Sequence, residues 1–261
     1  MLTDEQRQAA ADRLWAAQIE RAPIDPLTES CQDIGVVDAY EIQLLNIRRQ
    51  TAAGAVVCGH KVGLSSPVMQ QMMGVDEPDY GHLLDTMRYF DGAPVDAAQF
   101  CYPRIEVEVA YVLGAPLPGE GCTRADVLAA TDHVVPSLEL IDSRIKDWRI
   151  SLADTIADNA SSAGVILGTD KVAPKALDLA DIGAVLYRNG EQVAAGNTSA
   201  VLGDPTGAVA WLARKVAQFG VRLEAGHVIL PGSCTRALDA RPGDVFHAEF
   251  TGLGAVGVSF C

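Results

Sequence analysis

Two glutamates, Glu106 and Glu108, lie one residue apart in the apolar stretch 104–113. Side chains alternate between the two faces of a β-strand, so both carboxylates point to the same side, with their Cα atoms about 6.6 Å apart. Two like charges on a partly buried face need a cation or raised pKa values. This pattern predicts a divalent metal site; the alternative is an amphipathic strand whose acidic face is in water.

A third carboxylate favours the metal site over that alternative. Glu139 is the single charge in the apolar stretch 134–141, which is typical of a buried strand. An acid among Leu and Ile residues is costly unless it is paired. Three carboxylates without a nearby Cys or His pair suit Mg²⁺ or Mn²⁺ better than Zn²⁺, with coordination positions left for a chelating substrate.

Several polar segments are candidates for the rest of such a site. Lys61 ends an apolar run beside glycines, where it could bind a substrate carboxylate or move protons, or be an ordinary surface lysine. Asp79 follows Asp76 and Glu77 in what is either an acidic turn or a catalytic loop. The small, polar stretch 154–164 is predicted to be a loop, which could bind an anion or be a plain capped turn. The stretch 231–236 is predicted to form a second wall of the pocket.

Other chemistries lack their usual motifs. The chain contains no GxSxG, P-loop or GxGxxG sequence, which argues against serine hydrolases, nucleotide triphosphatases and dinucleotide-binding enzymes. Its formal charge of -14 and the absence of a Lys/Arg block argue against nucleic acid or an anionic membrane as a partner. Its 6 cysteines form no CxxC pair, and no stretch is apolar enough to cross a bilayer. A cytoplasmic protein with reduced thiols is expected.

The elements that must position these residues divide the chain into two predicted parts, 1–54 and 55–261. In the first part, Thr3 and Gln6 predict a capping box that opens a helix to about Glu20, then a loop over 22–32 and a second helix stopped by Gly54. The second part is predicted to be mainly strands, with helices over about 123–133 and 204–219 and a type I′ hairpin at Asn189-Gly190. The expected strands cover 55–62, 104–113, 134–141, 164–167, 184–196, 227–230, 244–250 and 255–260.

Taken together, these motifs resemble one enzyme family, the 2-hydroxypenta-2,4-dienoate hydratases, in the hydratase/decarboxylase branch of the fumarylacetoacetate hydrolase superfamily. The resemblance covers nearly the whole chain and rests on the segments 59–66, 70–81, 106–108, 136–144, 158–164 and 230–235. It implies an α+β protein in which a small N-terminal helical segment precedes a mixed β-sandwich roll of the fumarylacetoacetate hydrolase C-terminal type. It also implies the metal-dependent hydration of 2-hydroxypenta-2,4-dienoate in meta-cleavage degradation of aromatic compounds or steroids.

The resemblance also implies roles for individual residues. Mg²⁺ or Mn²⁺ would be bound by Glu106, Glu108 and Glu139. Lys61 matches the active-site lysine and Asp79 the acidic residue. The candidate substrate contacts are Ser161, which matches the hydroxyl near the substrate carboxylate, and Leu138. Relatives form homo-oligomers, so self-association is expected, and association with a neighbouring pathway enzyme is a further expectation.

Three rival functions are weighed against hydration. 4-Oxalocrotonate decarboxylase uses the same metal site on a substrate with a second carboxylate, for which Arg104, Arg144 and Arg236 are possible contacts or structural ion-pair members. Hydrolysis of acylpyruvates needs a His/Glu pair, and His60 has no evident partner, so hydrolysis is disfavoured. A non-catalytic scaffold for a pathway enzyme is the third rival, although it has no physical need for clustered carboxylates.

Overall fold

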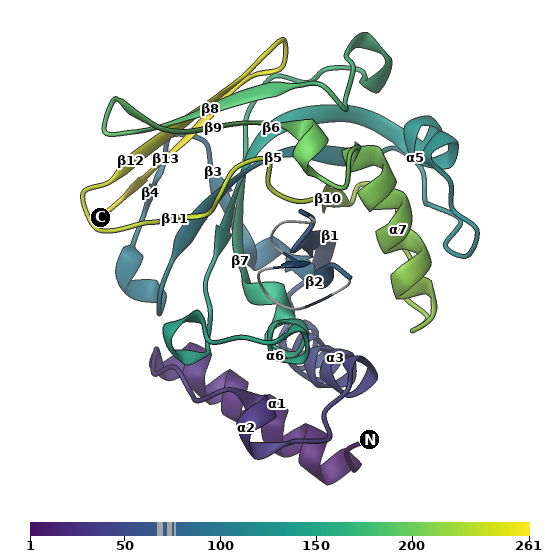
Figure 1. Cartoon of the computed structure of the whole chain (residues 1–261), viewed down its shortest axis with the longest axis vertical. Coiled ribbons are helices and arrows are strands. Elements are labelled where there is room, and N and C mark those ends of the chain that lie inside the picture. Colours follow the sequence, from purple (N-terminus) through teal and green to yellow (C-terminus); the bar gives the residue numbers. More distant parts are fainter. Residues whose placement is uncertain (67–69, 72–74, 76) are drawn as a thin grey trace.

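A helical end and two curled β-sheets make up the chain, seen here in a computed structural model that describes residues 1–66, 70, 71, 75 and 77–261 (Figure 1). Asp76 lies outside these described residues. The architecture confirms the expected α+β class. The helices are α1 (Asp4–Glu20), α2 (Leu27–Ser30), α3 (Val36–Ala52), α5 (Arg124–Ala130), α6 (Leu152–Ala157) and α7 (Pro205–Ala217).

The larger sheet has the order β2-β1-β10-β5-β6-β7-β3, and β11 pairs with the other end of β5. β1 pairs with β10 and β3 pairs with β7 in parallel, whereas the other pairs of its described strands are antiparallel, so the sheet is mixed. Its strands are β1 (Val57–Gly63), β2 (Asp79–Leu84), β3 (Arg88–Phe90), β5 (Arg104–Leu113), β6 (Thr131–Ile141), β7 (Ser162–Leu167), β10 (Val228–Leu230) and β11 (Leu238–Asp239).

The smaller sheet packs against β6 and β7, and the main hydrophobic core includes residues of both sheets. Its order is β4 (Pro94–Val95), β13 (Gly254–Phe260), β12 (Val245–Phe250), β8 (Gly183–Arg188) and β9 (Glu191–Asn197). The turn between β8 and β9 is the predicted type I′ hairpin, because Asn189 and Gly190 have φ values of 55° and 84°.

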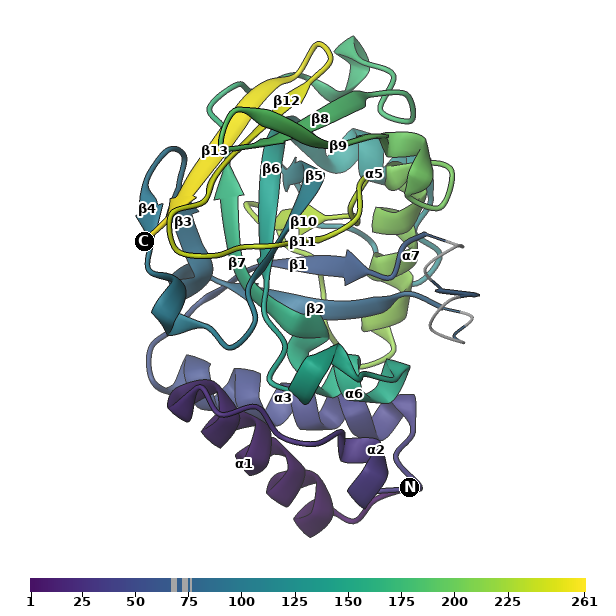
Figure 2. The same ribbon diagram turned by 60° about the vertical axis from the view of Figure 1, so that its left-hand side comes forward.

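The N-terminal helices dock on the roll through α3 and α6, with α6 between α3 and β2 (Figure 2). The predicted capping box is present, since the Thr3 hydroxyl accepts from the Gln6 N–H and the Gln6 side chain accepts from the Thr3 N–H. The Gln43 amide donates to the carbonyls of Tyr80 (3.0 Å) and Ile156 (2.6 Å), which ties α3 to the roll. A domain boundary after residue 54 stays a prediction.

Several predicted boundaries differ from the observed ones. The helix expected to reach His133 ends at Ala130, because the Thr131 hydroxyl bonds back to the Val127 carbonyl (2.7 Å) and Thr131 already pairs with β5. The short helix α2 interrupts the loop expected over 22–32. The stretch 154–164, expected to be a loop, contains the end of α6 and the start of β7, since Ser151 caps α6 with a capping box.

Candidate metal centre

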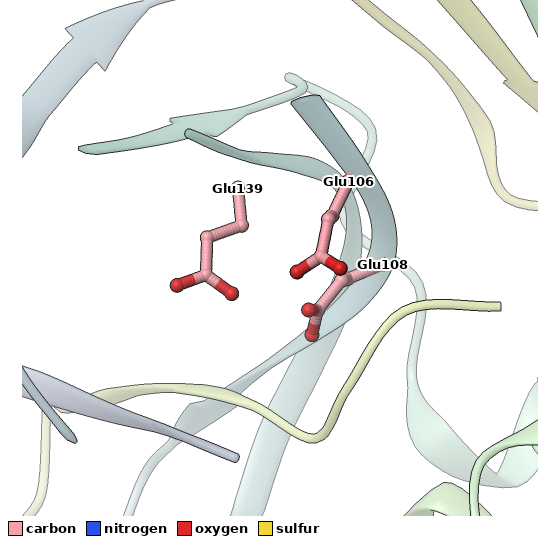
Figure 3. Close-up of side chains that lie close together, drawn as sticks. All are labelled: Glu106, Glu108 and Glu139. Atoms are coloured by element: carbon pink, nitrogen blue, oxygen red, sulfur yellow. The ribbon is translucent and has the colours of Figure 1, made fainter. Parts of the chain in front are cut away.

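The three glutamates of the predicted metal site meet on adjacent strands. In the antiparallel pair of β5 and β6, Glu106 lies directly opposite Glu139, and Glu108 is opposite Ser137. One carboxylate oxygen from each glutamate lies within 4.8 Å of the other two. Figure 3 shows the three side chains converging on one point in front of the sheet.

The carboxylates of this cluster are poorly compensated by the protein. Glu139 is 0% and Glu108 is 1% exposed. The Glu108 Oε2 atom accepts from the Gly232 N–H at 2.8 Å, but Glu108 Oε1 and both oxygens of Glu139 have no hydrogen-bond partner among the described residues. Burial raises the pKa of Glu139 to about 8 and the pKa of Glu108 well above its ordinary value. A cation at the cluster would relieve this cost, and an all-oxygen donor set fits a hard divalent ion such as Mg²⁺.

The segment between β10 and β11 keeps this face of β5 in place. β10 pairs with the C-terminal end of β5 and β11 with its N-terminal end. Between them the chain contacts the middle of β5, where Cys234 N–H donates to the Val107 carbonyl (3.0 Å) and the Val107 N–H donates to Ser233 Oγ (3.1 Å). Residues 233–236 of this segment line a 570 Å³ cavity beside Glu106, so this part of the predicted pocket wall does face a cavity.

Lys61 is a buried neighbour of the carboxylates and not a surface lysine. The residue is 2% exposed, and its Nζ lies 3.4 Å from Glu139 Oε1 and donates to the Ala160 carbonyl at 3.0 Å. Burial alone would lower the pKa of Lys61, but the negative field of Glu139 and the other nearby acids outweighs it and raises that pKa above its ordinary value. Lys61 is therefore a cation placed beside the cluster.

Asp79 is the first residue of β2, where an acidic turn or loop was expected. It is 3% exposed and lies opposite Gly63 of β1. Its Oδ2 accepts from the Thr155 hydroxyl at 2.6 Å, while Oδ1 has no hydrogen-bond partner among the residues described. Asp79 therefore offers one unpartnered carboxylate oxygen near Lys61.

Gly63 provides the space in which Lys61 and Asp79 meet. A Cβ atom on Gly63 would lie 2.2 Å from Asp79 Oδ1 and 2.9 Å from Lys61 Nζ. We expect Gly63→Ala to displace both groups and to lower kcat about 100-fold, the scale of loss for a misplacement of about 1 Å. Steady-state kinetics at saturating Mg²⁺ would measure the loss. The control is Gly35→Ala, which should keep full activity because the nearest atom to its new Cβ is 3.9 Å away. Equal activity in both variants would contradict this role of Gly63.

Ser161 closes a left-handed turn that faces the same pocket. Asn159, Ala160 and Ser161 have φ values of 54°, 49° and 55°, a conformation that costs energy in residues other than glycine. The Asn159 side chain stabilises the turn, because it accepts from the His82 N–H (2.7 Å) and donates to the His82 carbonyl (2.9 Å). The turn presents the Ala160 carbonyl to Lys61, and the buried Ser161 hydroxyl has no partner in the described chain.

These groups line one cavity of about 150 Å³. Lys61, Asp79, Glu106 and Ser161 are all in its wall. The structure does not bring Leu138 there: this fully buried side chain is part of the main hydrophobic core, whereas its neighbour Glu139 belongs to the carboxylate cluster. Gly63 and Trp148 are also in this wall, and no local sequence motif marks either residue as part of a site; Thr155, from the stretch 154–164, lies beside them.

His60 points away from the carboxylates, into a cluster of histidines. Its ring centroid lies 4.7 Å from that of His82 and 5.5 Å from that of His227. The alternation of β1 places His60 and Lys61 on opposite faces. His60 therefore lies outside the carboxylate cluster, and the exclusion of hydrolysis stays a prediction.

The buried histidines are expected to make the protein acid-sensitive. Burial lowers the pKa of His82 to about 4 and that of His60 well below its ordinary value. The unfolded chain binds these protons near pH 6.5, whereas the folded protein does not. The free energy of unfolding is therefore highest above pH 6.5 and decreases as pH falls toward 4, by about 3 kcal/mol for His82. His60→Leu should make the free energy of unfolding fall less steeply with decreasing pH, as measured by chemical denaturation at fixed Mg²⁺. The control His247→Gln, at an exposed histidine, should leave this slope unchanged. Parallel curves for His60→Leu and the unchanged protein would contradict the prediction.

The chain is similar to one known family over most of its length. Residues 83–260 match the family model described as fumarylacetoacetate (FAA) hydrolase C-terminal. The chain is 43% identical over 259 residues to the 2-keto-4-pentenoate hydratase of Paraburkholderia xenovorans (strain LB400), a match that covers 99% of this chain and 96% of the relative. It is 44% identical over 256 residues to the 2-oxo-hept-4-ene-1,7-dioate hydratase of Escherichia coli, with 96% of each chain covered.

A solved structure has nearly the same fold. The 4-oxalocrotonate decarboxylase from Pseudomonas putida G7, complexed with magnesium and adipate, superimposes with a TM-score of 0.97 at 38% sequence identity. The match covers 100% of this chain and 99% of that chain. The similarity therefore includes the helical end as well as the roll.

Proposed function

Because this chain belongs to the fumarylacetoacetate hydrolase family, and within it to the hydratase/decarboxylase branch, we propose that it hydrates 2-hydroxypenta-2,4-dienoate to 4-hydroxy-2-oxopentanoate. The chain is an enzyme of the hydro-lyase class, as its similarity to hydratases over nearly its whole length shows. This class membership replaces the hypothesis of a non-catalytic scaffold.

One observation carries the proposal: a buried carboxylate cluster with unpartnered oxygens adjoins a cavity lined by Lys61, Asp79 and Ser161. We propose that Glu106, Glu108 and Glu139 bind a divalent metal ion, either Mg²⁺ or Mn²⁺. The structurally similar decarboxylase was solved with magnesium, which supports this choice. When bound, such an ion supplies a Lewis acid that polarises the 2-oxo acid end of the substrate.

The residues of the cavity would perform the proton transfers. The enol O–H of the substrate loses its proton while C5 gains one, which gives the 2-oxo-3-enoate. Water then adds its hydroxyl to C4 and a proton to C3. Lys61 carries a proton at neutral pH and is suited to donate it or to stabilise a developing negative charge. Asp79 Oδ1 and the Ser161 hydroxyl have no hydrogen-bond partner among the residues that the structure describes. Asp79 Oδ1 can accept a proton, and the Ser161 hydroxyl can bind the substrate carboxylate.

The direct test follows the ultraviolet absorbance of enzymatically generated 2-hydroxypenta-2,4-dienoate. We expect it to be consumed with Mg²⁺ and to persist after exhaustive chelation with EDTA, and the product mass should increase by one water. Consumption that is unaffected by chelation would contradict the metal-dependent mechanism. Consumption without a gain of water would contradict hydration.

Decarboxylation of 4-oxalocrotonate is the second candidate, because the whole fold matches a decarboxylase. Release of CO₂ from 4-oxalocrotonate, with no water added to the monoacid, would favour it. Of the arginines considered for the second carboxylate, Arg144 is excluded by its buried ion pair with Asp158, at 2.5 Å between Nε and Oδ1. Arg236 is exposed at the rim of a neighbouring cavity.

The setting of the enzyme is also proposed. We infer a role in meta-cleavage catabolism of aromatic compounds or steroids, in the cytoplasm, and association with a neighbouring pathway enzyme. A homo-oligomer is also part of this proposal. Among the described residues, no helix combines the length and apolarity that crossing a membrane requires.

A further inference from the structure

Arg104 is a cation between the reaction cavity and solvent. It begins β5 two residues before Glu106, so alternation places both on the same face of the strand, with their Cα atoms about 6.6 Å apart. Arg104 lines the 150 Å³ cavity with Lys61 and Glu106, and it also lines the adjoining cavities of 570 Å³ and 470 Å³. Its side chain is 33% exposed.

The guanidinium of Arg104 is held by two contacts. Its Nε donates to Asp239 Oδ1 at 2.9 Å, and its Cζ lies 4.3 Å from the centroid of the Trp148 ring. Within the described part of the chain, neither terminal amino group of Arg104 has a hydrogen-bond partner. A guanidinium with a fixed plane and free terminal N–H groups is suited to bind a carboxylate through two bonds. Asp239 is 59% exposed, so solvent screens its charge and leaves Arg104 able to attract an anion.

We propose that Arg104 binds a second carboxylate at the far end of the substrate. The inference rests on the proposed function, in which the 2-oxo acid end of the substrate lies at the glutamate cluster. A five-carbon monoacid has no group for Arg104, whereas a longer 2-oxo-4-enoic diacid carries a carboxylate toward the outer end of the cavity. The substrate class therefore extends to diacids, and Arg104 determines the preference for them.

The test compares kcat/KM for 2-oxo-hept-4-ene-1,7-dioate with kcat/KM for 2-hydroxypenta-2,4-dienoate. In Arg104→Met the diacid-to-monoacid ratio should fall at least about tenfold, the cost of one charge-assisted hydrogen-bonded contact. Arg104→Lys should recover part of the ratio. The matched control is Arg88→Met, which removes an exposed arginine of β3 that lines none of these three cavities and should leave the ratio unchanged. An unchanged ratio in Arg104→Met, or an equal loss on both acids, would overturn the inference.

A binding measurement separates this inference from the proposed function. Titration calorimetry with the Mg²⁺-loaded protein should show tighter binding of adipate than of hexanoate, and Arg104→Met should remove the difference. If the unchanged enzyme consumes neither acid but shows this difference, the proposed reaction fails and the distal carboxylate site stands. Equal binding of adipate and hexanoate to the unchanged protein would overturn the site whatever the activity.

Discussion

Glu108→Gln is expected to abolish Mg²⁺-dependent turnover and to stabilise the metal-free protein. Loss of one carboxylate ligand should lower activity on the order of 10³-fold, as the loss of one strong electrostatic contact does elsewhere. In the unchanged protein, Glu108 Oε1 has no hydrogen-bond partner within the described chain. The introduced amide keeps an acceptor for the Gly232 N–H and can also donate to the neighbouring carboxylates. The gain in free energy of unfolding should be about 1–3 kcal/mol, the usual penalty of an unsatisfied buried group.

The pH dependence of this stabilisation has a defined sign. Burial and the neighbouring acids Glu139 and Glu106 raise the pKa of Glu108 in the folded protein. Glu108 therefore lowers the free energy of unfolding most at pH values above the ordinary carboxyl pKa. The advantage of Glu108→Gln over the unchanged protein should therefore be larger at pH 8 than at pH 5. Chemical denaturation of the metal-free proteins at both pH values measures it.

The matched control is Glu191→Gln, the same substitution at an exposed position of β9. It should change neither the Mg²⁺-induced rise in melting temperature nor the activity, whereas Glu108→Gln should lose both. Full activity in Glu108→Gln would remove this residue from the metal site. A metal-free variant less stable than the unchanged protein would show that the free carboxylate is not a burden.

Lys61→Met is expected to lower kcat by about 10²–10⁴-fold, the range for loss of a general acid or base. Methionine fills much of the buried volume without the charge that lies 3.4 Å from Glu139 Oε1. Mg²⁺ binding should survive, because the three carboxylates remain. Calorimetry of Mg²⁺ binding, carried out beside steady-state kinetics, separates a catalytic loss from a loss of metal.

Lys171→Met, at an exposed lysine, is the control for that substitution. It should leave kcat unchanged. A Lys61→Met enzyme with an unaltered kcat and a raised KM would show that Lys61 only binds substrate. Loss of Mg²⁺ binding in the same variant would show that Lys61 acts by organising the carboxylates.

Features that depend on local geometry could be predicted from the amino-acid sequence. The period of two in a strand placed Glu106 and Glu108 on one face, and Asn189-Gly190 predicted the hairpin because both residues tolerate positive φ. Thr3 and Gln6 likewise identified the start of α1. Each of these predictions needs only residues close together in the chain.

Which residues from distant parts of the chain share a face depends on how the strands pair in the folded protein. The register of β5 with β6 places Glu139 opposite Glu106, and the position of β1 brings Lys61 to them while His60 faces the other way. Leu138 belongs to the core for the same reason, since it adjoins Glu139 on a strand with alternating faces. Strand pairing and register depend on long-range burial, which the local pattern of one segment does not specify.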